Sequence, residues 1–281
     1  MAPPQLIFGT ANVGSVWTAP EDLDAPSQAT ARWRHSAFRY SSTLSSNLPR
    51  SFATNILAFT ADGSGEMTPD AIEKSAKESL EALRIEKINV LYSHRPDPST
   101  PLATQLKGVD AQFKLGRFKE FGVSNWPQAS IASFIELAEE SCAVKPTAAQ
   151  YQYNLLARHA EKEFIPFLRR HGIHSSWREG DPFAAGYRRW YIQPGMLAAV
   201  ERLTALCAEY SLPLPEAAMR WLAHHSALDE TDAILIGAKN VVQVEDTVRA
   251  VAAGPLPAGL VEGMNSVFDL CKDDAQSTVT F

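Results

Sequence analysis

Short apolar runs alternate along most of the chain with longer stretches in which apolar residues recur at helical spacing. Continuous apolar runs are typical of parallel strands that helices cover on both faces. Six such runs predict strands: residues 6–10, 53–59, 88–93, 121–125, 149–153 and 233–237. The pattern therefore indicates a sheet that is buried on both sides.

The stretches between these runs carry start and stop signals for helices. Thr68 supplies a capping hydroxyl before Pro69, and Ile72 and Ala76 follow at helical spacing. Four further stretches show the same periodicity: residues 101–117, 161–171, 196–210 and 215–225. The second of these ends just before Gly172, a residue type that commonly ends helices.

A strand–helix unit that recurs about every 30 residues predicts an α/β fold. The doubly wound open sheet and the closed (β/α)8 TIM barrel both have this order of elements. No G-x-G-x-x-G follows the first predicted strand, which argues against a doubly wound dinucleotide-binding sheet. We therefore predict one (β/α)8 barrel domain over residues 1–281, incomplete or irregular around residues 26–51 and 175–194, where no clear period is found.

Composition places the chain among globular enzymes and excludes several partners. Hydrophobic residues make up 45% of the 281 residues and charged residues 21%. The net charge of −6 gives no attraction to nucleic acid or to an anionic membrane surface. No apolar run approaches the roughly 20 residues of a membrane span, and the first residues do not resemble a signal peptide. We expect a cytoplasmic protein without nucleic-acid or membrane partners.

The three cysteines, Cys142, Cys207 and Cys271, are widely spaced and form no CxxC pair. This pattern argues against a disulfide framework and against a zinc site, and it is typical of a reducing compartment. The adjacent His224 and His225 lie in a helical pattern, where neighbouring side chains point in different directions. The sequence therefore predicts no metal centre.

Polar residues follow several of the predicted strands, and in a barrel the chemistry lies at these C-terminal strand ends. Residues 91–97 read LYSHRPD and resemble the LYLHxPD strand end of the aldo-keto reductases. Residues 116–125, GRFKEFGVSN, are similar to the G-K-[IV]-R-x-x-G-x-S-N segment of that family. Residues 150–154 resemble its Q-x-x-YN strand, and residues 8–10 and 236–246 resemble its first and last strands. The nearest branch comprises the aflatoxin-aldehyde-reductase-like and microbial members.

The resemblance implies hydride transfer to a carbonyl, with a tyrosine as proton donor and a histidine that positions the carbonyl. His94 matches the histidine of the motif. Tyr40 has the spacing of the tyrosine in D-T-A-x-x-Y, because residues 35–40 read HSAFRY, with His35 in place of the aspartate. A rival alignment on residues 28–32 keeps the T-A pair but supplies no tyrosine. A packed loop tyrosine and a histidine satisfied by a neighbour are the structural alternatives.

The lysine that lowers the pKa of the tyrosine in the family is absent. The strand that would carry it reads ATN at residues 53–55, and no lysine precedes Lys74. Asn55 donates hydrogen bonds but carries no charge, so it cannot replace an ammonium group. Tyr40 and Asn55 are also closer in sequence than the corresponding family residues, so most of one helix is missing between them.

The resemblance also implies an NADPH cofactor. Its nicotinamide would contact Ser124, Asn125 and Gln150, and its phosphates would meet the segment after the last strand, through Gly237, Lys239, Asn240 and Gln243. In the alternative interpretation, Ser124 and Asn125 cap the helix that begins near Pro127. Asn240 and Gln243 then form a start similar to a capping box for the next helix.

Two tryptophans leave further alternatives. Trp126 either lines the substrate mouth or packs in the core, and Trp177 either stacks on the nicotinamide or packs on the surface.

The leading hypothesis is NADPH-dependent reduction of a small-molecule aldehyde or ketone, in secondary metabolism. The second is a weakened or inactive relative that binds nucleotide or a partner, which the missing lysine favours. The third is a mistaken gene model in the two irregular segments. The sequence leaves the substrate and the oligomeric state undetermined.

Overall fold

The computed structural model describes residues 3–8, 53–56, 63–83, 85–179, 191–236 and 241–276. The chain divides into two compact units, which we describe separately. The first unit comprises Met1–Leu48, Gln152–Glu163 and Ser176–Val279, and the second comprises Pro49–Tyr151, Phe164–Ser175 and Thr280–Phe281. The prediction of one domain over residues 1–281 stays a prediction.

In the second unit, four parallel strands lie side by side in the order of the chain. They are β2 (Ala53–Ile56), β3 (Ile88–Ser93), β4 (Phe118–Ser124) and β5 (Pro146–Gln152). Because the pairing is parallel, the four C-terminal ends lie at one edge of the sheet. Residues that follow these strands are therefore brought together.

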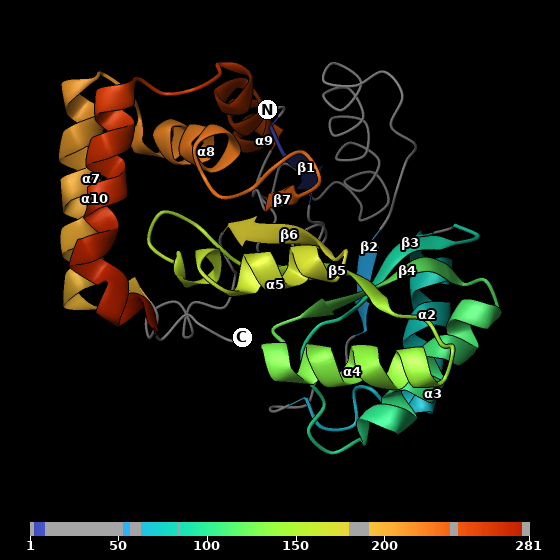
Figure 1. Ribbon diagram of the computed structural model, residues 1–281. Coiled ribbons are helices and arrows are strands. Elements are labelled where there is room, and N and C mark those ends of the chain that lie inside the picture. The colour runs from blue at the N-terminus through green and yellow to red at the C-terminus, as the bar shows by residue number, and fades with distance from the viewer. Residues whose placement is uncertain are drawn as a thin grey trace. The chain divides into compact units, whose positions relative to one another are not determined.

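The helices of the second unit connect and cover these strands (Figure 1). They are α2 (Pro69–Leu83), α3 (Leu102–Lys114), α4 (Gln128–Glu140) and α5 (Phe164–Arg170). Helix α2 begins as predicted, because the hydroxyl of Thr68 accepts a hydrogen bond from the backbone N–H of Ala71 at 3.3 Å. Ile72 and Ala76 on its inner face are fully buried.

In the first unit, β7 (Ala233–Ile236) lies between β1 (Gln5–Phe8) and β6 (His174–Glu179), and all pairing is parallel. The helical elements are η2 (His159–Glu161), α7 (Pro194–Glu209), α8 (Leu214–His224), α9 (Val241–Ala252) and α10 (Ala258–Ala275). Helices α7 and α10 pack side by side (Figure 1).

Each of the six predicted strands is present in whole or in part among the described residues. β3 has the predicted bounds, whereas β4 and β5 begin at Phe118 and Pro146, before the predicted starts at 121 and 149. Lys119 and Glu120 interrupt the apolar run of β4, although Phe118 before them is fully buried. Because polar residues occur near the start of each of these strands, the apolar pattern did not include their first residues.

The prediction of an irregular segment over residues 175–194 is wrong at its beginning, whereas its end coincides with the start of a helix. Ser176–Glu179 pair with Ala233–Ile236 as part of β6, and α7 begins at Pro194. The strand reads HSSWRE and lacks an apolar run, so the apolar pattern did not predict it; its backbone pairs with β7. Residues 26–51 and 180–190 lie outside the described residues.

The inner side of the second unit is closely packed under the strand ends. Val90, Tyr92 and Ala148 form a buried cluster on β3 and β5. A Cβ atom at Gly122 of β4 would lie 2.3 Å from Cδ1 of Tyr92, so only glycine leaves room for this ring. On the helix side, the Phe121 ring lies 5.6 Å from that of Phe134 in α4.

Candidate active site

Four of the predicted site residues gather at the C-terminal ends of β3, β4 and β5. His94 directly follows β3, whose last residue Ser93 pairs with Val123 of β4. Ser124 ends β4 and pairs with Gln150 of β5. The strand register therefore brings the histidine, the Ser-Asn pair and the glutamine to one edge of the sheet.

Asn125 joins two of these strand ends directly. Its side-chain Nδ2 donates hydrogen bonds to the backbone carbonyl of His94 at 2.8 Å and to Oγ of Ser124 at 3.2 Å. Its φ of 58° lies in the left-handed region, which asparagine adopts more readily than most residues. A strained backbone and a side-chain bond to the neighbouring strand end thus occur at one residue.

The helix-cap alternative for the Ser-Asn pair is wrong. Helix α4 has Pro127 as its N-cap residue, and no side chain makes a capping hydrogen bond there. Ser124 and Asn125 precede the helix but bond to each other and to His94. Their polar groups are therefore directed to the strand ends rather than to the helix N-terminus.

Ser124 and Gln150 are buried polar residues, with 4% and 7% of their surfaces exposed. Gln150 lies on the same face of β5 as the buried Ala148, because residues two apart in a strand share a face. A hydroxyl and two side-chain amides on neighbouring strands offer both donors and acceptors. This set fits the carboxamide of a nicotinamide, which needs both.

His94 itself is half-buried at the end of β3. Three residues later, Asp97 holds the loop that leads away from it. Its carboxylate accepts hydrogen bonds from the backbone N–H groups of Met67 and Ser99 at 2.9 Å and from the hydroxyl of Ser99 at 2.8 Å. Burial alone would raise the pKa of Asp97, but hydrogen bonds from Thr100, Met67 and Ser99 outweigh it and hold this pKa well below its usual value. The aspartate of the motif is therefore an ionised structural anchor.

The tyrosine and asparagine of the Q-x-x-YN motif also have structural roles here. The buried hydroxyl of Tyr153 donates to Glu161 at 2.7 Å and accepts from the backbone N–H of Ala227 at 3.1 Å. Burial, and then the negative charge of Glu161, raise the pKa of Tyr153 above its usual value. Oδ1 of Asn154 accepts from the backbone N–H of Leu156 at 2.9 Å and so forms a local turn.

The two alternatives for Trp126 are decided in favour of the core. Its side chain is fully buried and makes an edge contact with Phe134, with ring centroids 5.6 Å apart. A fully buried indole cannot line a substrate mouth that is open to solvent. Trp177 lies in β6.

Sequence reasoning missed two polar residues. Ser93 ends β3, and its hydroxyl accepts a hydrogen bond from the indole N–H of Trp126 at 3.0 Å. In the first unit, the hydroxyl of Tyr191 accepts hydrogen bonds from the side chains of Gln152 and Asn154, the latter at 2.9 Å. A serine within an apolar strand was a signal for Ser93, whereas no local pattern pointed to Tyr191.

Several predicted positions lie outside the described residues: His35, Tyr40, Gly237, Lys239 and Asn240. Their roles stay predictions. Gln243 is exposed in the first turn of α9. Asn55, which the motif comparison aligned with the family lysine, pairs with Tyr92 in the register of β2 and β3, and that alignment stays a prediction.

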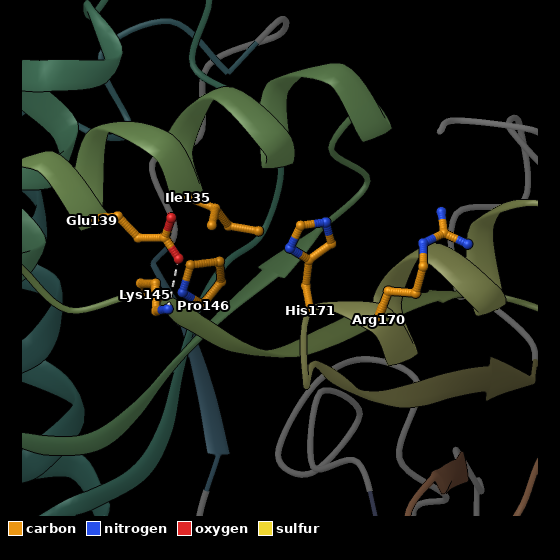
Figure 2. Close-up of a pocket in the computed structure, with 6 residues that line it drawn as sticks. All are labelled: Ile135, Glu139, Lys145, Pro146, Arg170 and His171. Atoms are coloured by element: carbon orange, nitrogen blue, oxygen red, sulfur yellow. Dashed lines mark hydrogen bonds and ion pairs between the residues drawn. The ribbon is translucent and has the colours of Figure 1, made fainter.

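A pocket of about 170 Å³ lies elsewhere in the second unit (Figure 2). Six residues line it: Ile135, Glu139, Lys145, Pro146, Arg170 and His171. Lys145 and Glu139 form an ion pair at 2.9 Å. Pro146 begins β5, so this pocket lies at the opposite end of the strand from Gln150.

Within the described residues, no group of three or more His, Cys, Asp or Glu side chains is placed to bind a metal ion. All three cysteines carry free thiols. The rings of His224 and His225 bond to different backbone groups, the carbonyl of Val251 and the N–H of Leu256. None of the described helices is long and apolar enough to cross a membrane.

The described elements define an α/β protein with parallel strands, in which buried polar side chains collect at the C-terminal strand ends. The model of the Aldo/keto reductase family matches residues 59–267. The chain belongs to this family and is therefore an oxidoreductase of the aldo/keto reductase type. The resemblance seen in the sequence motifs is confirmed.

Curated relatives come from fungi and from mammals. The chain is 30% identical over 232 residues to an aldo-keto reductase of Pseudocercospora fijiensis, covering 72% of this chain and 78% of the relative. It is 30% identical to the oxidoreductase sirO of Leptosphaeria maculans, in an alignment that covers 97% of this chain and 96% of the relative. It is 26% identical over 236 residues to aflatoxin B1 aldehyde reductase member 2 of Rattus norvegicus, and the alignment covers 73% of this chain and 64% of the relative.

Proposed function

We propose that this protein reduces a small-molecule aldehyde or ketone to an alcohol, with NADPH as the hydride donor. The observation that carries the proposal is the contact between Asn125 and His94, 2.8 Å from Nδ2 to the carbonyl oxygen. It joins the group that would hold the nicotinamide to the group that would place the carbonyl. The aldehyde named in the mammalian relative supports a carbonyl substrate, and a role in secondary metabolism stays a prediction.

The residues of the site would divide the chemistry among them. Bound NADPH supplies the hydride. Ser124, Asn125 and Gln150 would orient its carboxamide from two neighbouring strand ends. His94 would place and polarise the carbonyl oxygen, and Tyr40 would give that oxygen a proton.

Turnover should be slow near neutral pH. No lysine precedes Lys74, and Asn55 occupies the position of the family lysine. No ammonium group from that part of the chain therefore stabilises the phenolate that proton transfer leaves on the tyrosine.

Strand order supports a (β/α)8 barrel as the fold that presents this site. In the second unit each strand pairs with its neighbour in the chain, from β2 to β5. In the first unit the first strand, β1, pairs with β7, the last of the described strands. A doubly wound sheet starts in the middle and reverses direction, whereas a barrel places its first strand beside its last.

The choice of NADPH over NADH rests on the segment after β7. Gly237, Lys239, Asn240 and Gln243 would meet the phosphates, with the positive charge of Lys239 beside the start of α9. Gln243 and Thr247 replace an arginine and an asparagine of the family motif. We therefore expect NADPH to bind more weakly than in a member that keeps those residues.

Two measurements test the proposal. Titration of the protein with NADPH, followed by the change in cofactor fluorescence, should give saturable binding that is tighter than for NADH. Incubation with NADPH and a nitrobenzaldehyde should produce the alcohol and consume NADPH in equal amounts. A folded protein that binds no NADPH at millimolar concentration would overturn the proposal.

The absence of the lysine favours a second candidate function, a weakened relative that binds nucleotide without efficient turnover. The same two measurements separate the candidates. Saturable NADPH binding without alcohol formation over a range of aldehydes and ketones would select the binding protein.

A further inference from the structure

Hydrogen bonds connect residues 93–95 to the segment that follows β4. The indole Nε1 of Trp126 donates to Oγ of Ser93 at 3.0 Å, and that hydroxyl donates to the backbone carbonyl of Arg95 at 2.8 Å. Asn125 donates to the carbonyl of His94 between them. The carbonyl of His94 is therefore held directly by Asn125, and the carbonyl of Arg95 is held by Ser93, whose hydroxyl Trp126 fixes.

Trp126 is itself held in place. The hydroxyl of Tyr151 on β5 donates to the backbone carbonyl of Trp126 at 2.7 Å and accepts from its backbone N–H at 3.0 Å. Tyr151 is 2% exposed, and its ring makes an edge contact with Phe164 at 4.6 Å between centroids. The anchor of the network is thus a fully packed residue of a third strand.

The serine is a particular feature of this chain. The motif that residues 91–97 resemble reads LYLHxPD, and Ser93 stands where that pattern has a leucine. A leucine side chain has no acceptor for the buried indole N–H of Trp126, and it cannot donate to the carbonyl of Arg95. The serine therefore creates a connection from the tryptophan to the histidine that the family pattern lacks.

We infer that Trp126 is a positioning residue for His94, acting through Ser93 from the same segment that presents Ser124 and Asn125. This inference rests on the proposed function, in which His94 places the carbonyl. The consequence is a link between the two halves of the site, because Asn125 and Trp126, which supply the donors around His94, directly follow Ser124 in the chain.

The test is Trp126→Phe, which removes the indole N–H and keeps a buried aromatic ring. The matched control is Trp221→Phe, because Trp221 is also fully buried and its Nε1 donates to Oδ1 of Asn265 at the same 3.0 Å. Trp221 belongs to the first unit, whereas His94 belongs to the second. Both variants lose one indole hydrogen bond, so a merely structural effect appears equally in both.

Two readouts separate positioning from packing. The first is kcat/KM for the carbonyl at saturating NADPH, which we expect to fall about tenfold to a hundredfold in Trp126→Phe and less than twofold in Trp221→Phe. The second is the pH titration of the His94 ring resonances by NMR, assigned with His94→Ala. We expect those resonances to shift in Trp126→Phe only.

A double-mutant cycle tests the route through the serine. Ser93→Ala should show the same loss as Trp126→Phe, and the double variant should be no worse than either single variant. Ser93→Ala also serves where Trp126→Phe fails to fold.

Unchanged His94 resonances and turnover in both Trp126→Phe and Ser93→Ala, or equal effects of the Trp221 control, would overturn the inference. Failure of the proposed function is a distinct result. In that case the wild-type protein shows neither NADPH binding nor turnover, and the NMR titration alone decides whether Trp126 positions His94.

Discussion

The side-chain amide of Asn125 donates a hydrogen bond to the backbone carbonyl of His94 across the ends of β4 and β3, with a donor–acceptor distance of 2.8 Å. This contact links the two sequence motifs that carry the resemblance to the family. It also explains why a residue with a φ of 58° is an asparagine, since the same residue must tolerate a left-handed backbone and supply a donor.

Asn125→Asp should therefore damage the site while keeping the backbone conformation. Aspartate tolerates the left-handed region, but its carboxylate would face the carbonyl of His94 without a proton to donate. We expect a loss of about 1–3 kcal/mol in the free energy of unfolding and an NADPH affinity at least tenfold weaker. Urea unfolding and fluorescence titration measure the two effects. Wild-type stability in this variant would mean that the contact to His94 does not hold the strand ends together.

Asp97 should make the stability of the protein depend on acid pH. Its folded-state pKa lies below the ordinary value of about 3.9, because the hydrogen bonds from Thr100 and Met67 outweigh the effect of burial. A lowered pKa gives a stabilisation that is complete above about pH 4 and is lost as the pH falls through the folded-state pKa. Asp97→Asn should cost about 2 kcal/mol at pH 7 and remove this part of the acid dependence.

Urea unfolding at a series of pH values between 7 and 3 checks the prediction for Asp97. Asp269→Asn is the control, because it removes the same charge from a side chain that is 75% exposed. The gap in unfolding free energy between wild type and Asp97→Asn should narrow towards acid pH. A constant gap would contradict the assignment of Asp97 as an ionised anchor.

Gly122→Ala should disturb the packing beneath the site. The added Cβ would lie 2.3 Å from Cδ1 of Tyr92, two residues before His94, so the ring or the strand must move. Overpacking of this kind costs about 1–3 kcal/mol, which thermal or urea unfolding measures. The double variant Gly122→Ala/Tyr92→Leu should recover part of the loss, since it removes the ring that the methyl group meets. Additive losses would show that the two residues do not compete for one space.

Tyr153→Phe should destabilise the protein without weakening cofactor binding. The hydroxyl of Tyr153 bonds to Glu161 and to the backbone of Ala227, so its removal takes one hydrogen bond from each of two half-buried partners. We expect a loss of about 2 kcal/mol in unfolding free energy, with the NADPH dissociation constant changed less than twofold. Tyr210→Phe, at a tyrosine that is 39% exposed, is the control and should change neither quantity. A large loss of NADPH affinity would instead place Tyr153 in the cofactor site.

Asn55→Lys tests whether the missing charge limits turnover. Asn55 pairs with Tyr92 on the neighbouring strand, two residues before His94, so a lysine there enters the strand that flanks the histidine. If Tyr40 is the proton donor, an ammonium group beside it should raise kcat about tenfold near neutral pH, which corresponds to one pKa unit. The gain should disappear in Asn55→Lys/Tyr40→Phe. A gain that persists in the double variant would assign the proton to another group.

The sequence by itself determined the family and the α/β order of elements, and it named four residues of the proposed site. His94, Ser124, Asn125 and Gln150 follow or end apolar strands that are readable from local periodicity, and parallel pairing then places such positions at one edge. Local patterns succeed here because strand formation by buried apolar runs and the grouping of strand ends both follow from the chain order.

Only the tertiary structure decided what the polar groups around these positions do. β6 was invisible because its pairing with β7 rests on backbone hydrogen bonds between residues far apart in sequence. Trp126 was assigned to the core by burial, and its bond to Ser93 joins residues 33 positions apart. The direction of a side chain and the identity of its partner are properties of packing between distant segments. For this reason periodicity and motif spacing could name residues of a proposed site but could not show how the structure holds them in place.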